Sequence, residues 1–450
     1  MKSMKLGSVA FAAMLVAVAC TPGAGTTAPG SQPAASGPAS APAASDPAAS
    51  DPAASDPAAS DPAGSPPAGG DLGSVTIPAG EPINLGFWGV LSGPNASLGE
   101  DSRRGMEIAI EDRGELFGRP IELISQDGLC TPEGGATAAQ AIAADTTIVG
   151  LIGSICSDET VGGIQTITNA GFTTISPSNT RPSLTDPERD ETFAGYLRTA
   201  HSDAIQGAVA ANFVYNELGL RTAATIHDGS AYGEALVGVF VDEFTALGGE
   251  VPVEEAVAVG ETNMSTVLTN VAAADPEILY FPIFTAEGGF IADQAAGTAG
   301  LEEVALMGAD GLFSADFVNA AGPNVEGMYL SSPDFTAFGD EYAGFLEKYD
   351  AAYGGNPIQI FHAHAYDATN MLLDAIESVA QEDGEDLVID RGALRDAIYA
   401  TTDFPGITGT LSCSESGDCS DPFISVYQIT EREVGGEWPP EAPIWSPEGE

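Results

Sequence analysis

The sequence predicts an α/β protein of two lobes, each a mostly parallel β-sheet flanked by helices. Three observations lead to this prediction. From residue 82 onward, short apolar segments alternate with amphipathic stretches of helical period, the order that builds parallel sheets with helices on both faces. These strands are too numerous for one ordinary sheet, so two sheets are expected. About 370 of the 450 residues follow the N-terminal region, enough for two cores.

The expected elements follow one another in a regular order. Strands are expected at 83–91, 121–125, 147–152, 173–176, 222–226, 277–281 and 304–307. Helices are expected at 99–112, 133–145, 203–218 and 232–247. Each apolar segment has the length of a buried strand, and each helical stretch is long enough to return the chain to the other end of the sheet.

The first 80 residues are not expected to join either lobe. Residues 1–20 combine Lys2 and Lys5, a short apolar run and small residues before Cys20, the pattern of a secretory signal. The apolar run is too short to cross a bilayer, which takes about 20 residues. A cysteine at the cut resembles a bacterial lipoprotein signal and implies a mature chain that begins at lipidated Cys20. A plain signal peptide with an incidental cysteine is the alternative.

Residues 21–80 contain almost no large apolar side chain, and their centre repeats Ser-Asp-Pro-Ala-Ala. Such a segment cannot bury enough apolar surface to fold, so it is expected to be a disordered tether.

The whole chain is strongly acidic: 14 Lys and Arg against 65 Asp and Glu give a net charge of −51. A nucleic-acid partner is therefore not expected. Attraction to anionic lipid is not expected either, so membrane attachment would depend on the lipid at Cys20.

Five cysteines divide into Cys20 and two pairs. An exported compartment permits disulfides, which are expected between Cys130 and Cys156 and between Cys413 and Cys419. In the chain-entropy model the first of these bonds would contribute roughly 3 kcal/mol to the stability of the folded chain.

Neither a metal site nor a catalytic site is expected. His362 and His364 lie two residues apart on an expected helix, so their side chains diverge. His227 and Asp228 could suggest a hydrolase, but the chain lacks the Gly-x-Ser-x-Gly turn that would carry the nucleophile. No enzymatic activity, cofactor or metal is therefore predicted.

Candidate site residues come from the ends of the expected strands, because ligands of parallel sheets bind at the carboxyl ends of strands. Hydroxyl side chains dominate the strand ends of the first half, whereas carboxylates and aromatic rings follow in the second. The strand-end residues are Trp88, 91–94, 127–130, 156–157, 178–180, 227–228, Phe284 and Asp310.

Taken in order, these segments resemble the periplasmic leucine/isoleucine/valine-binding proteins of ABC importers, whose fold is the type 1 periplasmic-binding-protein fold. The similarity covers residues 83–429. It rests on Leu91-Ser92-Gly93-Pro94, the Cys130 loop, Gly153-Ser154-Ile155-Cys156-Ser157, Ile175-Ser176-Pro177-Ser178-Asn179-Thr180, Leu197-Arg198-Thr199, His227-Asp228 with Tyr232-Gly233-Glu234, and Met307-Gly308-Ala309-Asp310-Gly311. It implies two lobes that are joined by three crossing segments and close on a ligand.

The crossings are expected near Ala200, Ser332 and Pro422. Lobe 1 would then comprise 82–202 and 333–422, and lobe 2 would comprise 203–332 and 423–450. The resemblance also implies that Cys130 and Cys156 form the disulfide of the family's first lobe. A bond between Cys413 and Cys419 has no counterpart in the best-known members.

The resemblance assigns a role to each polar candidate. The Ser157 hydroxyl would donate to the α-carboxylate of an amino acid. The Thr180 backbone N–H would donate to that carboxylate, and the Thr180 hydroxyl would face the ammonium. The Ser178 carbonyl would accept from the ammonium, and Asp310, where the family commonly has Glu, would pair with it. The alternative is structural: Ser157, Ser178 and Thr180 would cap helices and Asp310 would occupy a turn.

The remaining candidates would contact the ligand's side chain. Trp88, Leu98 and Phe284 could form an apolar wall, with Leu98 standing where the family has a Tyr. Tyr232 and Phe284 match aromatic positions that close over the ligand. Asn179 lies between Ser178 and Thr180 and is included in the candidate site. Trp88 could instead be a core residue.

The function expected from these residues is that of a monomeric, membrane-tethered solute receptor. It would capture a branched-chain or other apolar amino acid and deliver it to an ABC permease. A binding protein for an amide, urea or small aromatic acid is one alternative, although the polar candidates match a zwitterion. A sensor subunit that reports the ligand to a partner is another.

Overall fold

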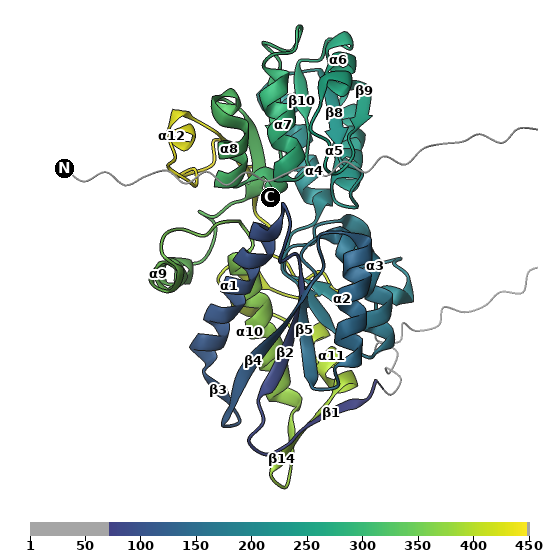
Figure 1. The fold of residues 1–450 in the computed structure, drawn as a ribbon, viewed down its shortest axis with the longest axis vertical. Coiled ribbons are helices and arrows are strands. Elements are labelled where there is room, and N and C mark those ends of the chain that lie inside the picture. Colours follow the sequence, from purple (N-terminus) through teal and green to yellow (C-terminus); the bar gives the residue numbers. More distant parts are fainter. Residues whose placement is uncertain (1–71, 448–450) are drawn as a thin grey trace, which may run out of the picture. The chain divides into compact units, whose positions relative to one another are not determined.

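The computed structural model describes residues 72–447, which belong to one compact unit, Pro67–Glu450 (Figure 1). The predicted signal segment with Cys20 and most of the predicted tether lie outside the described residues. Two six-stranded sheets with helices on their faces form two lobes, which confirms the predicted two-lobed α/β fold. No helix between residues 72 and 447 has both the length and the apolar character to cross a bilayer.

The sheet of lobe 1 has the strand order β3-β4-β2-β5-β6-β7. Its strands are β2 (Ile83–Gly89), β3 (Glu115–Leu116), β4 (Arg119–Asp127), β5 (Ile148–Gly153), β6 (Thr174–Ser176) and β7 (Tyr196–Arg198). All neighbours run parallel except β3 and β4. The sheet therefore directs the ends of β2, β4, β5 and β6 toward the same edge, where the strand-end candidates were expected.

The sheet of lobe 2 has the strand order β17-β12-β11-β10-β8-β9. Its strands are β8 (Thr222–His227), β9 (Glu250–Ala256), β10 (Ile278–Tyr280), β11 (Ala305–Gly308), β12 (Tyr329–Pro333) and β17 (Ile424–Gln428). Only the pair of β12 and β17 is antiparallel. The chain passes between the two sheets after β7, after β12 and before β17, so each lobe is built from separate stretches of sequence.

Helices cover both faces of each sheet. In lobe 1 they are α1 (Ala96–Arg113), α2 (Pro132–Ala144), α3 (Ser157–Asn169), α9 (Glu341–Tyr353), α10 (His362–Val379) and α11 (Arg391–Tyr399). In lobe 2 they are α4 (Asp203–Asn212), α5 (Gly233–Leu247), α6 (Ser265–Ala273), α7 (Thr285–Ala295), α8 (Ala315–Ala321) and α12 (Glu431–Val434). Figure 1 shows α2 and α3 side by side on one face of lobe 1, and α1 with α10 on the other.

Smaller elements complete the described chain. A three-stranded sheet joins β1 (Ser74–Ile77), β14 (Asp386–Asp390) and β13 (Gln381–Asp383), and β15 (Phe404–Gly406) pairs with β16 (Gly409–Leu411). The helix expected at 203–218 divides into α4 and a π-helical turn, Phe213–Glu217. Short 3-10 turns lie at Pro182–Leu184, Glu191–Phe193, Asp310–Leu312 and Gly322–Val325.

Strand β1 corrects the predicted end of the tether at residue 80. Ser74–Ile77 pairs antiparallel with β14. The side chains of Val75 and Ile77 are buried in the main core, whereas Ser74 and Thr76 are exposed. This alternation of apolar and polar residues is the signature of a half-buried strand. Only four residues long and set among glycine and proline, it was too short to be recognised in the sequence.

Glycines allow α2 and α3 to pack closely. A Cβ added to Gly135 in α2 would lie 2.3 Å from the carbonyl oxygen of Glu159 in α3, and one added to Gly162 in α3 would lie 2.0 Å from the carbonyl oxygen of Pro132. Side chains at these positions would force the helices apart. Because α3 begins at Ser157, this contact also sets the position of a candidate ligand-binding residue.

Candidate ligand-binding site

A pocket with a volume of about 20 Å³ lies between the two lobes. Its lining comes from lobe 1 on one side and from lobe 2 on the other: Leu98, Ile155, Cys156, Ser157, Ser178, Thr180 and Phe361, and Tyr232, Phe284, Asp310 and Gly311. Seven of the nine predicted ligand-binding residues are in this set. Strands and helices far apart in the sequence bring these side chains together at the facing ends of the two sheets.

The N-terminus of α3 is held in place by a buried carboxylate. Glu159 accepts hydrogen bonds from the backbone N–H groups of Ile155 (3.1 Å), Cys156 (2.9 Å) and Cys130 (2.9 Å). Burial raises the pKa of Glu159 to about 7. The disulfide between Cys130 and Cys156 joins the same two segments. Ser157 follows directly and presents its hydroxyl at the pocket, where no described residue forms a hydrogen bond with it.

The loop after β6 brings Ser178 and Thr180 to the lining of the pocket. Within the described chain, neither the Ser178 carbonyl oxygen nor the Thr180 N–H takes part in an intramolecular hydrogen bond. Asn179, between them, points the other way: its Oδ1 accepts from the hydroxyls of Ser154 (3.2 Å) and Thr160 (2.5 Å). An acceptor and a donor are thus left free at the pocket, while the residue between them anchors the loop.

Asp310 follows β11 and is buried at the lobe 2 side of the pocket. Its Oδ1 accepts hydrogen bonds from the Tyr232 hydroxyl (2.6 Å) and from Gln206 Nε2 (3.0 Å). Both donors are neutral groups. The carboxylate therefore has a fixed orientation, but no cationic side chain among residues 72–447 forms an ion pair with it, and a ligand's ammonium group could supply the missing charge.

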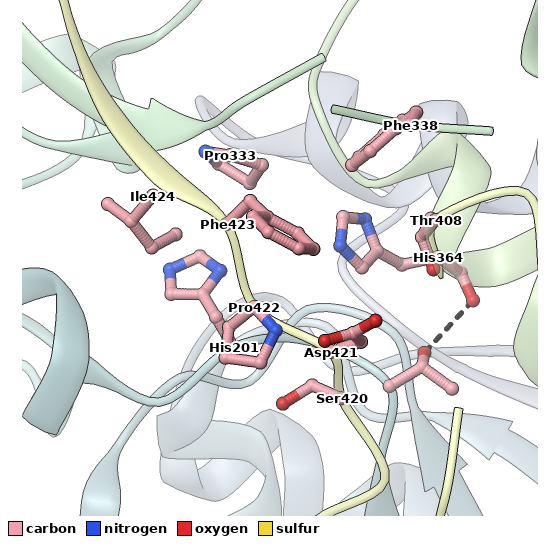
Figure 2. Close-up of a pocket in the computed structure, with 11 residues that line it drawn as sticks. His201, Pro333, Phe338, His364, Thr408, Ser420, Asp421, Pro422, Phe423 and Ile424 are labelled. Atoms are coloured by element: carbon pink, nitrogen blue, oxygen red, sulfur yellow. Dashed lines mark hydrogen bonds between the residues drawn. The ribbon is translucent and has the colours of Figure 1, made fainter. Parts of the chain in front are cut away.

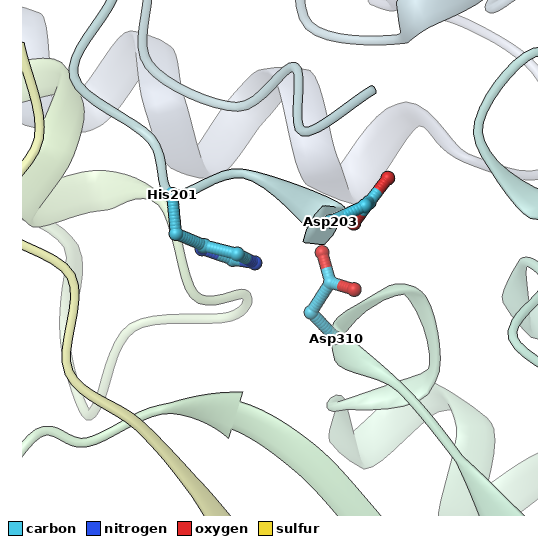
Figure 3. A group of neighbouring side chains, drawn as sticks. All are labelled: His201, Asp203 and Asp310. Atoms are coloured by element: carbon cyan, nitrogen blue, oxygen red, sulfur yellow. The ribbon is translucent and has the colours of Figure 1, made fainter. Parts of the chain in front are cut away.

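A second buried carboxylate, which the sequence analysis missed, lies beside Asp310. Asp203 is the first residue of α4, and its Oδ2 accepts from the Thr180 hydroxyl at 3.0 Å. Polar side-chain atoms of His201, Asp203 and Asp310 all lie within 4.8 Å of one another (Figure 3). Asp203 Oδ1 is buried and has no hydrogen-bond partner among the described residues. Burial, followed by the charge of Asp310, raises the pKa of Asp203 well above its usual value.

Two carboxylates and an imidazole can also bind a divalent metal. One contact argues against that use of His201. Its Nε2 lies 2.7 Å from Gln206 Oε1, and Gln206 Nε2 donates to Asp310, so the amide oxygen is the acceptor and His201 Nε2 carries the proton. A protonated Nε2 is not a metal ligand, so only Nδ1, which has no hydrogen-bond partner among the described residues, could serve as one. An ammonium group, with three donors, matches the free carboxylate oxygen better.

The rest of the pocket is apolar. Leu98 on α1, Ile155 and Phe361 contribute from lobe 1, and Phe284 contributes from lobe 2. The rings of Tyr232 and Phe284 lie 5.3 Å apart between centroids. Phe361 was missed because it directly precedes α10 and follows no expected strand. Apolar side chains beside a polar end suit a small amphiphilic ligand.

Two predicted ligand-binding residues do not line the pocket. Trp88 is fully buried, and its Nε1 donates to Thr174 Oγ1 at 3.0 Å. The indole packs in a separate core cluster with Ile142 and Ile164, beneath α2 and α3. Since side chains alternate along β2, this strand-end position faces the helices rather than the pocket. Asn179 is likewise turned inward, as described above, because its amide oxygen ties the loop to its neighbours.

A second, smaller cavity lies where the crossing segments meet (Figure 2). Its volume is about 10 Å³, room for one water molecule but not for an amino acid. The lining includes His201, His364, Pro422 and Phe423. Burial lowers the pKa of His201 and, more strongly, that of His364, so both imidazoles are neutral near pH 7. The pocket between the lobes, not this cavity, matches the predicted site.

Comparisons with known proteins agree with the resemblance expected from the sequence. The sequence model of the family described as "Periplasmic binding protein" matches residues 82–422. The "Leucine-, isoleucine-, valine-, threonine-, and alanine-binding protein" of Pseudomonas aeruginosa is 27% identical over 78% of this chain and 90% of its own length. The "Leu/Ile/Val-binding protein homolog 3" of Brucella melitensis is 27% identical over 79% of this chain and 93% of its own.

A similar fold is found among solved structures. The branched-chain amino acid transporter substrate-binding protein of Streptococcus pneumoniae, solved in complex with isoleucine, superposes with a TM-score of 0.70. The sequence identity is 23%, and the alignment covers 80% of this chain and 98% of that one. At this identity the likeness establishes the fold.

Proposed function

Because the chain belongs to the periplasmic binding protein family, an extracytoplasmic family of binding proteins rather than enzymes, we propose that it captures an α-amino acid between its two lobes. The ligand has a branched-chain or other apolar side chain. The single observation that carries this proposal is the pairing, in one pocket, of a polar end that matches a zwitterion with an apolar wall. The names of the relatives support the same ligand class.

Each end of the zwitterion has a partner in this proposal. The carboxylate accepts hydrogen bonds from the Ser157 hydroxyl and the Thr180 N–H. The ammonium donates to the Ser178 carbonyl and to Asp310, with Asp203 close enough to add its charge. Charge-assisted hydrogen bonds of this kind are stronger than neutral ones. The apolar side chain of the ligand then packs against Leu98 and Phe284.

The ligand enters through movement of the lobes. A volume of about 20 Å³ holds one or two water molecules, far less than an amino acid needs. The three crossing segments are the natural hinge, because within the described part of the chain they join the lobes covalently. The lobes therefore separate to admit the ligand and close again around it, and the closed form delivers it to an ABC permease.

We also propose that the protein is exported and works as a monomer, tethered to the outer face of the membrane by a lipid on Cys20. Segment 1–20 and the Ala/Pro/Ser/Asp-rich segment up to β1 support this part of the proposal. Cys20→Ser should release the protein from the membrane fraction. Retention of the variant in membranes washed at high salt would contradict the anchor without affecting the proposed ligand.

A neutral ligand such as an amide or urea is the main competitor, but two buried carboxylates favour a cationic group. Calorimetry with wild type, Asp310→Asn and Thr180→Ala decides between them. An amino acid should bind Asp310→Asn at least about thirtyfold more weakly, because a buried charged pair loses roughly 2–5 kcal/mol. Thr180→Ala should cost less, since only a hydroxyl is removed. If wild type binds an amide but no amino acid, the proposal fails.

A further inference from the structure

The loop closed by Cys413 and Cys419 lies against the edge of the lobe 1 sheet. The disulfide joins residues six positions apart. The Arg198 N–H donates to the Gly417 carbonyl oxygen at 2.9 Å, and the Cys419 N–H donates to the Arg198 carbonyl oxygen at 3.0 Å. Strand β7, which contains Arg198, is the last strand of that sheet. The stapled loop thus continues the sheet at an edge that would otherwise be open.

Within this loop, Asp418 forms an ion pair with the buried Arg198 side chain, which is 1% exposed. Its Oδ2 accepts from Nη2 at 2.6 Å and from Nε at 3.1 Å. The remaining nitrogen, Nη1, donates to the carbonyl oxygens of Asn179 (3.4 Å), Thr180 (3.1 Å) and Arg181 (3.0 Å). One guanidinium group therefore connects the stapled loop to the loop that lines the pocket.

The connection from Arg198 also affects the Thr180 N–H, the proposed ligand-binding group, because a peptide group is rigid. The Asn179 carbonyl and the Thr180 N–H belong to one planar peptide group and point in opposite directions. When Arg198 holds the Asn179 carbonyl oxygen on one side, the Thr180 N–H is directed to the other side. Thr180 lines the pocket, and its N–H has no intramolecular partner among the described residues.

We propose that Asp418 is a positioning residue for the ligand: through Arg198 it aims the Thr180 N–H at the ligand's carboxylate, and the Cys413–Cys419 bond holds it in place. The inference rests on the proposed function, in which that N–H binds an α-carboxylate. Asp418 does not itself touch the ligand. Its effect should therefore be confined to ligands that carry a carboxylate, and should be small for those that carry an amide instead.

Two variants test this role. Asp418→Ala removes the carboxylate, and the double variant Cys413→Ser/Cys419→Ser keeps Asp418 and Arg198 but frees the loop. Glu415→Gln is the matched control, because Glu415 is an exposed acid of the same loop that does not contact Arg198. Calorimetry gives the dissociation constants for the amino acid that wild type binds and for its α-amide, and thermal unfolding gives Tm.

We expect Asp418→Ala and the double-serine variant to bind the amino acid about tenfold more weakly than wild type, while binding of the amide changes little. Glu415→Gln should match wild type for both ligands.

A lower Tm with an unchanged preference for the carboxylate would overturn the proposal, because it would make the loop a stabilising element only. Tighter amino-acid binding would overturn it too, because Asp418 would then act by its charge alone. Should Asp418→Ala not fold, the double-serine variant decides. A wild type that binds no amino acid would contradict the proposed function itself.

Discussion

The carboxylate of Asp158 in lobe 1 accepts a hydrogen bond of 3.0 Å from the backbone N–H of Ala231 in lobe 2. Asp158 is the second residue of α3, next to Ser157, and Ala231 precedes Tyr232, so the contact spans the lobes beside the pocket. Burial raises the pKa of Asp158, and the nearby charge of Asp228 raises it further. If the lobes close on a ligand as proposed, a contact between them at this point should stabilise the closed form and slow ligand release.

Asp158→Ala should release the ligand roughly fivefold faster, because one hydrogen bond contributes about 1 kcal/mol. Asp158→Asn keeps an oxygen acceptor and should release it at nearly the wild-type rate. Stopped-flow measurement of dissociation checks both, with Glu347→Gln, an exposed acid on α9, as the control. Equal rates for Asp158→Ala and wild type would show that the contact does not hold the lobes together.

Binding of an amino acid should weaken as the pH falls. The pKa of Asp203 is raised in the ligand-free protein, so the carboxyl holds a proton over a pH range in which an ordinary Asp has lost it. An ammonium group favours the ionised form, so ligand binding should release that proton. Calorimetry at one pH in two buffers of different ionisation enthalpy measures the release. Asp203→Asn should abolish it, and a binding heat independent of the buffer in wild type would refute this linkage.

Asp203 should also affect the stability of the ligand-free protein. Its contribution to stability should fall as the pH rises, whereas amino-acid binding should strengthen. Because the folded-state pKa of Asp203 is raised, its stabilising contribution is present below the unfolded-state pKa of about 3.9 and is lost as the pH rises toward the folded-state value. Ligand-free Asp203→Asn should therefore have a higher Tm than wild type at pH 7, and the difference should shrink near pH 4. A lower Tm for the variant at pH 7 would mean that the charge of Asp203 is balanced in the ligand-free protein.

The contact between α2 and α3 can be tested with two helical glycines. Gly135→Ala places a Cβ 2.3 Å from a backbone oxygen, so it should cost about 1–3 kcal/mol and lower Tm by several degrees. Gly238 in α5 has open space around its Cβ position, and Gly238→Ala should stabilise the protein by about 0.4–1 kcal/mol. Differential scanning calorimetry compares the two. A similar Tm for both variants would contradict the close helix packing.

Salt should stabilise this protein. A net charge of −51 creates self-repulsion in the compact state, and added ions screen it. Tm should therefore rise steeply between about 0.01 and 0.5 M KCl, where the screening length falls from roughly 30 Å to under 10 Å. A nonionic solute at equal osmolality is the control. A Tm that does not respond to salt would show that the negative charges are already compensated on the folded surface.

The sequence predicted the fold well, because hydrophobic periodicity and strand order are local signals that survive in the folded state. The segments of polar strand-end residues were also informative: Ser157, Ser178, Thr180 and Asp310 do meet in one pocket. The direction in which each side chain points was harder to predict. Trp88 ends a strand as expected, yet its side chain faces α2 and α3, because one residue of register decides which face of a strand a side chain occupies.

Long-range pairing could not be predicted. In the sequence, Asp203 follows Ser202 and has the pattern of an ordinary helix N-terminus. The structure agrees with that pattern, because the Ser202 side chain accepts a hydrogen bond from the N–H of Ala204. Nothing in the sequence near Asp203 indicates that Asp310 lies beside it. The ion pair of Arg198 and Asp418 is similar, because the two residues are 220 positions apart. Only the folding of each lobe brings such residues together.

The interleaved order of the strands has a consequence for biosynthesis. A nascent chain that stops at residue 360 lacks α10, whose Leu372 covers Gly150 in β5, and also lacks β17, the partner of β12. Neither lobe is complete at that point, and β12 still presents an open edge that other chains could join. The final fifth of the polypeptide is needed by both halves at once. Productive folding should therefore await the finished chain, which would suit the export proposed above.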